Sequence, residues 1–230
     1  MVINENFPGL KRIKNGDYVY AGNLESNETI EIKLDNRFVI KGFIKSLKSI
    51  IATYDIKADE GITAGEGITA DEGITAGWGI TAGEGITAGE GITAGWGITA
   101  GEGITAGEGI TAGWGITAGE GITAGWGITA GEGITAGEGI TADEGITAGC
   151  GIEAGEGITA GEGITAGEGI EAKTFIQCEK RIFAGISIYN TEENCQKDIT
   201  CAELRQGEIC YGNLILRKEI NSERTDKDNL

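Results

Sequence analysis

The hydrophobic positions of this chain recur at every sixth residue. From Gly61 to Ala172 the sequence repeats a hexad of Gly-Ile-Thr-Ala-Gly followed by Glu or Trp, with few exceptions. Its isoleucine is the only large aliphatic residue of the hexad, so the repeat predicts a ladder of core isoleucines. A repeat with so short a period determines the architecture and has to be interpreted before any local motif. The first members of the predicted core ladder are Ile62, Ile68, Ile74, Ile80, Ile86, Ile92, Ile98, Ile104 and Ile110.

Each hexad predicts one short strand and one corner. A period of six does not follow the 3.6 residues of a helical turn, and two glycines per hexad would cost a helix about 2 kcal/mol relative to alanine. In an extended Ile-Thr-Ala segment, the isoleucine and alanine point to one side and the threonine to the other. The Gly-Glu-Gly segment then turns the corner, where we expect glycine to supply positive φ.

The glutamates are expected to face water. Between Lys57 and Lys173 the chain has no lysine or arginine. An inward column of glutamates would therefore be buried without partners, at a cost of several kcal/mol per ion. Isoleucine and alanine go inward, while threonine and the Glu or Trp go outward. Successive coils can then pair their backbones in parallel at a spacing of about 4.8 Å.

The number of hexads in one coil has three possible values. Two hexads would make a thin slab that aligns three aspartates, and four would make a square needing larger side chains inside. Three hexads make a triangular coil, which three Ile and three Ala can fill at native packing density. This triangular coil aligns Trp78, Trp96 and Trp114 with Cys150, and it makes Glu153 and Glu171 neighbours. The slab would instead align Asp59, Asp71 and Asp143. We predict the triangular coil.

The same phase continues beyond the regular repeat, from Ile32 and Phe38 to Ile176, Ile182 and Ile188. Open solenoid ends expose unpaired backbone groups, so both ends are expected to be covered. The fold predicted is all-β: a single parallel β-solenoid (β-helix) of six-residue strand-corner repeats with β-rich N- and C-terminal caps. The boundaries are an N-terminal cap at 1–48, the solenoid at 49–188 with its near-perfect repeats at 61–172, a C-terminal cap at 189–220 and a disordered tail at 221–230.

The three-sided coil resembles the left-handed hexapeptide β-helix, although here the small residue follows the aliphatic one by two positions where that family places it before. Handedness therefore stays open. The chain is also similar to uncharacterised bacterial and bacteriophage-encoded proteins with GxIxAG repeats, over roughly residues 50–216. The segments RIFAGISIY (181–189) and ITCAELRQGEICYGNLIL (199–216) resemble the C-terminal region of those proteins. In architecture alone, the chain is loosely similar to bactofilins, which are polymer-forming cytoskeletal proteins.

The composition excludes several classes of function. The 230 residues include no histidine, so Ser-His-Asp and Cys-His systems and His-ligated metals are excluded. The formal net charge is −18, and residues 59–172 carry sixteen Glu and three Asp without a base. This charge opposes direct binding of nucleic acid or of an anionic membrane. The five cysteines show no CxxC spacing and are expected to be free thiols.

We therefore expect a non-enzymatic structural or interaction scaffold, an acidic rigid rod that binds a protein partner or self-associates, without a cofactor. Large aromatics exposed in a row are typical of a contact surface, although stacked rings can also shield one another. The candidate partner-binding residues are Trp78, Trp96, Trp114 and Trp126.

Two alternatives remain open: an inhibitor that mimics nucleic acid and occupies the basic groove of a DNA-binding protein, and a surface rod that binds divalent cations such as Ca²⁺ through its carboxylates. No segment has the length of a membrane span or the apolar core of a signal peptide. The expected location is the cytoplasm, or the virion if the chain is phage-encoded.

Overall fold

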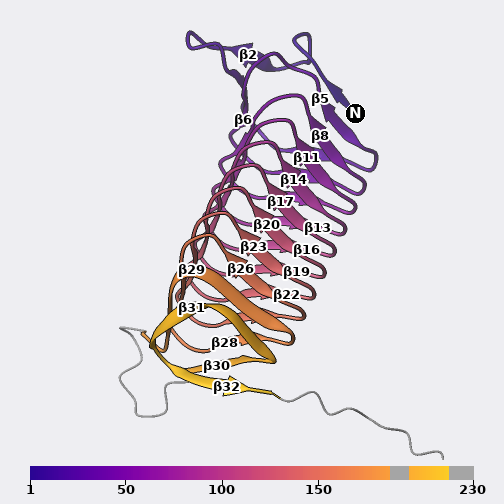
Figure 1. The fold of residues 1–230 in the computed structure, drawn as a ribbon. Helices are drawn as coiled ribbons and strands as arrows, with labels where there is room; N and C mark the ends of the chain where they lie inside the picture. The colour runs from indigo at the N-terminus through magenta and orange to yellow at the C-terminus, as the bar shows by residue number, and fades with distance from the viewer. Residues whose placement is uncertain (187–196, 218–230) are drawn as a thin grey trace, which may run out of the picture.

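The chain forms a long parallel β-solenoid (Figure 1). The structure is a computed structural model and describes residues 1–186 and 197–217. These residues contain strands and turns and no α-helix, so none of their segments is a helix long and apolar enough to cross a membrane. The predicted all-β solenoid is confirmed.

One coil consists of three hexads, each of which contributes one strand. Ile62 pairs in parallel with Ile80, and Ile80 pairs with Ile98, so each strand lies beside the strand three hexads further along the chain. The same offset holds for the other regular strands. The triangular coil is therefore correct, and the two-hexad slab that would align the aspartates is not. The stacked strands form three faces, which we name in chain order.

The first face contains one strand from every coil and forms an eleven-stranded sheet. Its strands are β4 (Leu24–Ser26), β7 (Ile44–Ser46), β10 (Ile62–Ala64), β13 (Ile80–Ala82), β16 (Ile98–Ala100), β19 (Ile116–Ala118), β22 (Ile134–Ala136), β25 (Ile152–Ala154), β28 (Ile170–Ala172), β30 (Asp198–Cys201) and β32 (Asn213–Leu216).

The second face follows along the chain and starts with the N-terminal strand. It consists of β1 (Val2–Ile3), β5 (Ile30–Ile32), β8 (Ile50–Ala52), β11 (Ile68–Ala70), β14 (Ile86–Ala88), β17 (Ile104–Ala106), β20 (Ile122–Ala124), β23 (Ile140–Ala142) and β26 (Ile158–Ala160).

The third face completes each coil. It consists of β2 (Leu10–Arg12), β3 (Tyr18–Tyr20), β6 (Phe38–Ile40), β9 (Ile56–Ala58), β12 (Ile74–Ala76), β15 (Ile92–Ala94), β18 (Ile110–Ala112), β21 (Ile128–Ala130), β24 (Ile146–Ala148) and β27 (Ile164–Ala166). Two long strands, β29 (Phe175–Ala184) and β31 (Glu203–Tyr211), each run across the second and third faces.

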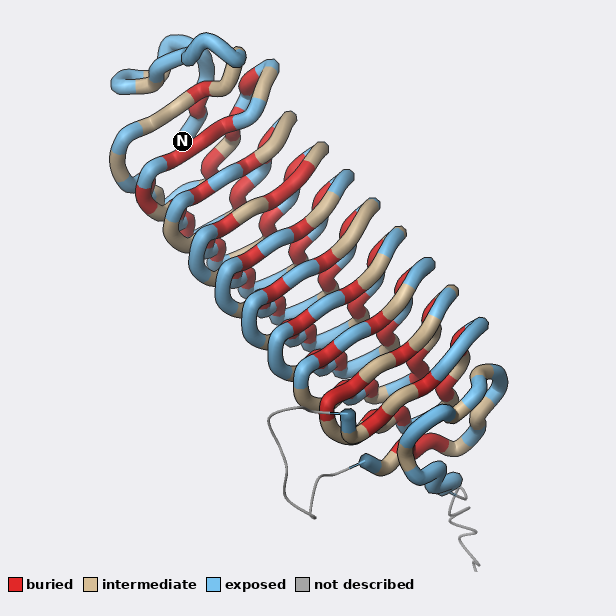
Figure 2. Tube along the Cα trace, turned by 90° about the vertical axis from the view of Figure 1, so that its left-hand side faces the viewer, coloured by how far each residue is buried: buried red, intermediate tan, exposed pale blue. Residues whose placement is uncertain are grey.

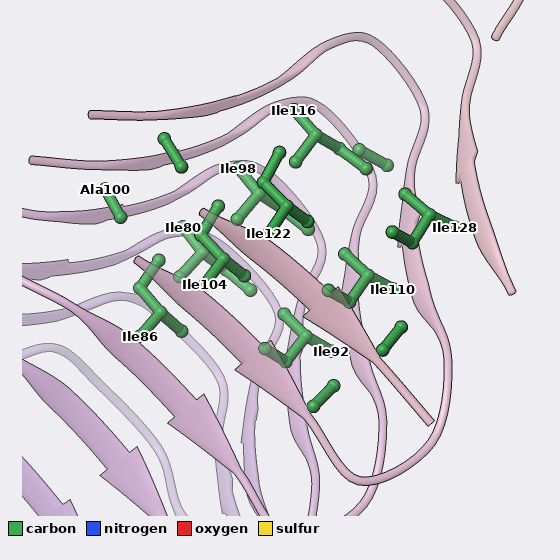
Figure 3. Close-up of a cluster of buried hydrophobic side chains, with 14 of the residues drawn as sticks. Ile80, Ile86, Ile92, Ile98, Ala100, Ile104, Ile110, Ile116, Ile122 and Ile128 are labelled. Atoms are coloured by element: carbon green, nitrogen blue, oxygen red, sulfur yellow. The ribbon is translucent and has the colours of Figure 1, made fainter. Parts of the chain in front are cut away.

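The core is the predicted ladder of isoleucines and alanines. Every residue of the core ladder from Ile62 to Ile110 is fully buried, and the alanines two positions later are nearly so. In Figure 3, Ile92, Ile110 and Ile128 lie one above another on the third face. Burying each isoleucine contributes about 1.5–3 kcal/mol. Buried and exposed segments therefore alternate along every coil in Figure 2, as the hexad predicts.

The corner glycines are favoured for a reason other than the one expected. No glycine between Gly61 and Gly169 has positive φ. Instead, a Cβ added to the glycine after the alanine would meet the backbone of the preceding coil: at Gly101 it would lie 2.0 Å from the Gly83 oxygen. The close approach of the coils therefore favours glycine at this corner, although aspartate occupies the same position at Asp71 and Asp143.

The N-terminal end is a closed continuation of the solenoid. Regular pairing begins before residue 49, since Ile44 pairs with Ile62 and Phe38 with Ile56. The assignment of Ile32 to the hexad isoleucine position is wrong, because Ile30 pairs with Ile50 while Ile32 pairs with Ala52. The offset between these two strands exceeds that of a regular coil, because the chain between β5 and β6 is longer than a regular corner. Both Ile30 and Ile32 are nevertheless buried.

A hairpin covers this end. Strand β2 pairs with β3 in antiparallel orientation, and Phe7 packs edge-on against Tyr20 with ring centroids 5.7 Å apart. The hydroxyl of Tyr18 is hydrogen-bonded to Asp35 at 2.8 Å. The inward side chains of the first coil, Ile3, Tyr18 and Leu24, are buried beneath these groups.

The C-terminal coils are irregular. Ile176 and Ile182 on β29 keep the register of the repeat, as predicted, but β31 pairs with β29 through several register shifts. The segment YGNL (211–214) echoes YAGNL (20–24), and both lead from the third face into a strand of the first face at opposite ends of the rod. The predictions for Ile188 and for the tail at 221–230 fall outside the described residues.

Candidate functional site

The outward residues of the hexads form three columns, one along each edge of the triangular rod. The glutamate corner lies between the first and second faces, the mixed corner between the second and third, and the tryptophan corner between the third and first. The glutamate corner consists of Glu66, Glu84, Glu102, Glu120, Glu138 and Glu156. The mixed corner consists of Tyr54, Glu72, Glu90, Glu108, Trp126, Glu144 and Glu162. The tryptophan corner consists of Glu60, Trp78, Trp96, Trp114, Glu132, Cys150 and Glu168.

The tryptophan corner carries three stacked indole rings. The centroids of Trp78 and Trp96 lie 5.6 Å apart with an interplanar angle of 11°, and those of Trp96 and Trp114 lie 5.5 Å apart with an angle of 6°. The backbones are paired as well, since the Trp96 amide donates to the Trp78 carbonyl at 3.2 Å. Both faces of the Trp96 ring are therefore covered, while its edge remains open.

The rings are still half exposed. Trp78 and Trp96 each keep 50% of their surface, and Trp114 keeps 55%. Three adjacent indole edges thus form an apolar stripe on a rod whose other corner residues are almost all acidic. Glu60 and Glu132 continue the column beyond the two ends of the stack. The stripe offers flat apolar contact bordered by negative charge.

Trp126 does not belong to this stripe. It lies on the mixed corner, where its amide donates to Glu108 and its carbonyl accepts from Glu144. No described aromatic ring stacks on it, and it is 53% exposed. The structure therefore brings together three of the four candidate tryptophans and places the fourth on another edge.

The mixed corner holds a cluster of carboxylates that sequence reasoning did not single out. Oxygen atoms of Asp55, Glu72 and Glu90 lie within 4.8 Å of one another. Burial and the neighbouring Asp55 raise the pKa of Glu72, and the charge of Glu72 raises the pKa of Tyr54. The sequence does contain a sign of this cluster, because a coil of three hexads puts Tyr54, Glu72 and Glu90 in one column.

Asp55 already has protein partners in this cluster. Its carboxylate pairs with Arg37 at 3.2 Å and accepts a hydrogen bond from the Gly73 amide at 2.9 Å. Three carboxylates offer at most six oxygen ligands, which is the lower limit for Ca²⁺. The arrangement could hold a divalent cation only if these ligands were shared with the existing partners.

The thiols are poor candidates for chemistry. Cys150 is half-buried in the tryptophan corner, and burial together with Glu168 and Glu132 raises its pKa. Burial also raises the pKa of Cys178 and Cys201, which lie in the core. A protonated thiol is a weak nucleophile. Cys210 is exposed, and Cys195 lies outside the described residues.

A shallow groove of about 490 Å³ lies on the first face near the C-terminal end. Glu153 and Glu171, which replace threonine in two hexads, stand side by side there as predicted. Arg217 closes the groove with an ion pair to Glu171 at 2.8 Å. The groove is lined mainly by polar groups and contains a matched charge pair, so it does not form an apolar pocket for a small molecule.

Comparison of the chain with protein-family models, with curated proteins and with solved structures finds no match.

Proposed function

We propose that the protein is a non-enzymatic structural or interaction scaffold, an acidic rigid rod that holds a protein partner along its side or joins to other rods. The observation that supports this most is the stack of Trp78, Trp96 and Trp114. Half-exposed indoles in a row are uncommon on a polar surface and are typical of protein contacts. We place the rod in the cytoplasm, or in the virion if the chain is phage-encoded, as the GxIxAG resemblance suggests.

The repeat also supports a structural role. Each interior coil presents the same core and nearly the same faces as its neighbours, so the regular part of the rod repeats one local environment many times. A catalytic site needs several different groups held in one unique arrangement. The column of tryptophans is the main departure from the repeated surface, and it suits contact better than chemistry.

The test is capture of partners from host extract with three immobilised proteins: wild type, Trp96→Ala and Trp126→Ala. A partner that wild type and Trp126→Ala retain and Trp96→Ala loses would support the tryptophan corner as the contact. Trp126→Ala removes an equally exposed indole from another edge and controls for nonspecific binding. Equal recovery by all three proteins would contradict the proposal for this corner.

The same experiment tests the second candidate, mimicry of nucleic acid. Residues 59–172 carry nineteen acids without a base, in columns that a basic groove could contact. Recovery of a DNA-binding protein that Trp96→Ala still binds and added DNA displaces would favour mimicry. For the remaining alternative, a cation-binding rod, Ca²⁺-dependent light scattering that Glu72→Gln abolishes would be the supporting result.

A further inference from the structure

The two ends of the rod differ, and the difference concerns the core. At the N-terminal end Phe7 packs against the core, and Leu24 in the first coil is only 3% exposed. At the C-terminal end the last coil is formed by β31 and β32 (Figure 1). Leu214 and Leu216 lie above Ile199 and Cys201, which are fully buried, yet they are 40% and 56% exposed. Among the described residues, no strand lies beyond them.

Within the described residues, the C-terminal strand β32 also has an unpaired backbone edge. Strand β32 pairs with β30 on one side, and no described strand pairs with its other side. Strand β31 is likewise paired only with β29 among the described strands. An open strand edge that carries apolar side chains is a template for further β-pairing. In the part of the chain that the structure describes, the core cross-section and the unpaired strand edges thus lie together on one surface.

We propose that this end binds the same end of a second copy, so that two rods join head to head through antiparallel pairing of β32 with β32. This inference rests on the proposed scaffold role and names one of its partners. A second copy presents the same triangular outline and the same open core, so it can bury both ends at once. The two-fold symmetry makes the contact closed, which gives a dimer of double length.

The residues of β32 fit a two-fold axis at Ile215. Ile215 lies in the middle of the strand and points outward, because its partner Thr200 follows the inward Ile199. In an antiparallel pair centred on it, Ile215 faces its own copy, and the inward Leu214 faces the inward Leu216 of the other chain. Opposed residues then point to the same side, as antiparallel pairing requires.

The charges favour contact at this end over contact along the sides. Residues 197–217 contain three acids and three bases, whereas residues 59–172 contain nineteen acids and no base. Two rods side by side would bring columns of like charge together, whereas two ends meet without net repulsion. The N-terminal end in turn opposes a head-to-tail filament, because its core is already closed.

The first experiment measures the mass of the full chain in solution by light scattering coupled to size-exclusion chromatography. We expect twice the chain mass of 23.8 kDa for the wild type. Ile215→Lys places two ammonium groups at the two-fold axis and should halve the mass. Ile51→Lys is the matched control, because Ile51 is an outward isoleucine of similar exposure on β8, far from this end, and should leave the dimer intact.

The second experiment does not depend on the stability of a lysine variant. Under mild oxidation, Ile215→Cys should form a disulfide-linked dimer to a far greater extent than the wild type or Ile51→Cys. A monomeric wild type, an open-ended filament, or equal crosslinking of the two cysteine variants would overturn the inference. Any of these results would contradict the dimer alone, and the partner-capture experiment on Trp96 would still decide the scaffold role. Failure of the partner-capture experiment would in turn not change the mass measured for the wild type.

Discussion

The indole of Trp96 stacks on that of Trp114 with centroids 5.5 Å apart and an interplanar angle of 6°, although three hexads separate them in the sequence. The coil length alone brings them together, since one full turn of the solenoid returns the chain to the same corner. The stack therefore contributes to stability as well as presenting an apolar edge. The two roles call for two measurements, unfolding for stability and capture of partners for contact.

Replacing Trp96 by alanine removes two ring contacts. Each stacked aromatic pair contributes about 0.5–1.5 kcal/mol beyond area burial, so Trp96→Ala should destabilise the rod by about 1–3 kcal/mol. Trp126→Ala, which removes no stacked ring, should have little effect. Urea unfolding followed by circular dichroism measures both, and equal effects of the two variants would contradict a contribution from stacking.

The core ladder predicts a strong response at one strand. Ile110 is fully buried in β18, and the next residue, Thr111, points to solvent. Ile110→Asp buries a carboxylate without a partner, which costs several kcal/mol, while Ile110→Val should cost about 0.5–1.5 kcal/mol. Thr111→Asp introduces the same charge at the neighbouring position and should fold normally. Similar melting temperatures for the two aspartate variants would show that the inward and outward assignments are wrong.

The sequence sufficed to predict the regular part of the rod. The hexad places Ile62 in the core and aligns Trp78, Trp96 and Trp114 once three hexads are assigned to each coil, because every coil repeats the same local conditions. The predicted alignment of these three tryptophans is confirmed, and Trp126, which a coil of three hexads leaves out of their column, lies on the mixed corner.

The ends and corners could not be predicted in the same way. Ile32 was assigned to the wrong position of its strand because the longer connection between β5 and β6 interrupts the period. The reason for the corner glycines was missed because the distance from Gly101 to Gly83 is set by coil stacking and is not visible in one hexad. The repeat also does not specify where the stacking of strands ends, so it could not predict that no described strand lies beyond Leu214.

The two glycines of one corner should respond differently to alanine. At Gly101 an added Cβ would lie 2.0 Å from the Gly83 oxygen, whereas at Gly103 it would lie 3.3 Å from the Gly121 oxygen. Gly101→Ala should destabilise the rod by about 1–3 kcal/mol, as overpacking does. Gly103→Ala should be close to neutral, because the lower entropy of the unfolded chain offsets a tight contact.

The destabilisation expected for Gly101→Ala is limited. Asp71 and Asp143 occupy the same hexad position as Gly101, so a corner can shift to accommodate a Cβ. We therefore expect Gly101→Ala to fold with a lower unfolding midpoint. Equal midpoints for the two alanine variants in urea would contradict close approach of the coils as the reason for the glycine.

The carboxylate cluster of the mixed corner predicts a pH dependence that can be isolated. Burial and the charge of Asp55 raise the pKa of Glu72, so the folded state binds a proton that the unfolded state releases. The cost of ionising Glu72 is present above this raised pKa and disappears as the pH falls through it. Glu72→Gln should therefore be more stable than the wild type at neutral pH, and its advantage should shrink at mildly acidic pH.

The stability of Glu72→Gln has to be compared with that of the wild type at each pH, because the pKa values of other carboxylates are shifted in the opposite direction. Lys48 lowers the pKa of Glu28 and Lys33 lowers that of Glu31, so stability from these pairs is lost as acid protonates the carboxylates. Both proteins share that loss, and it cancels in the difference between their unfolding free energies in urea. Glu102→Gln, on the glutamate corner, is the control for removing one charge from the rod. A difference between Glu72→Gln and wild type that stays constant with pH would show that burial and the charge of Asp55 do not raise the pKa of Glu72.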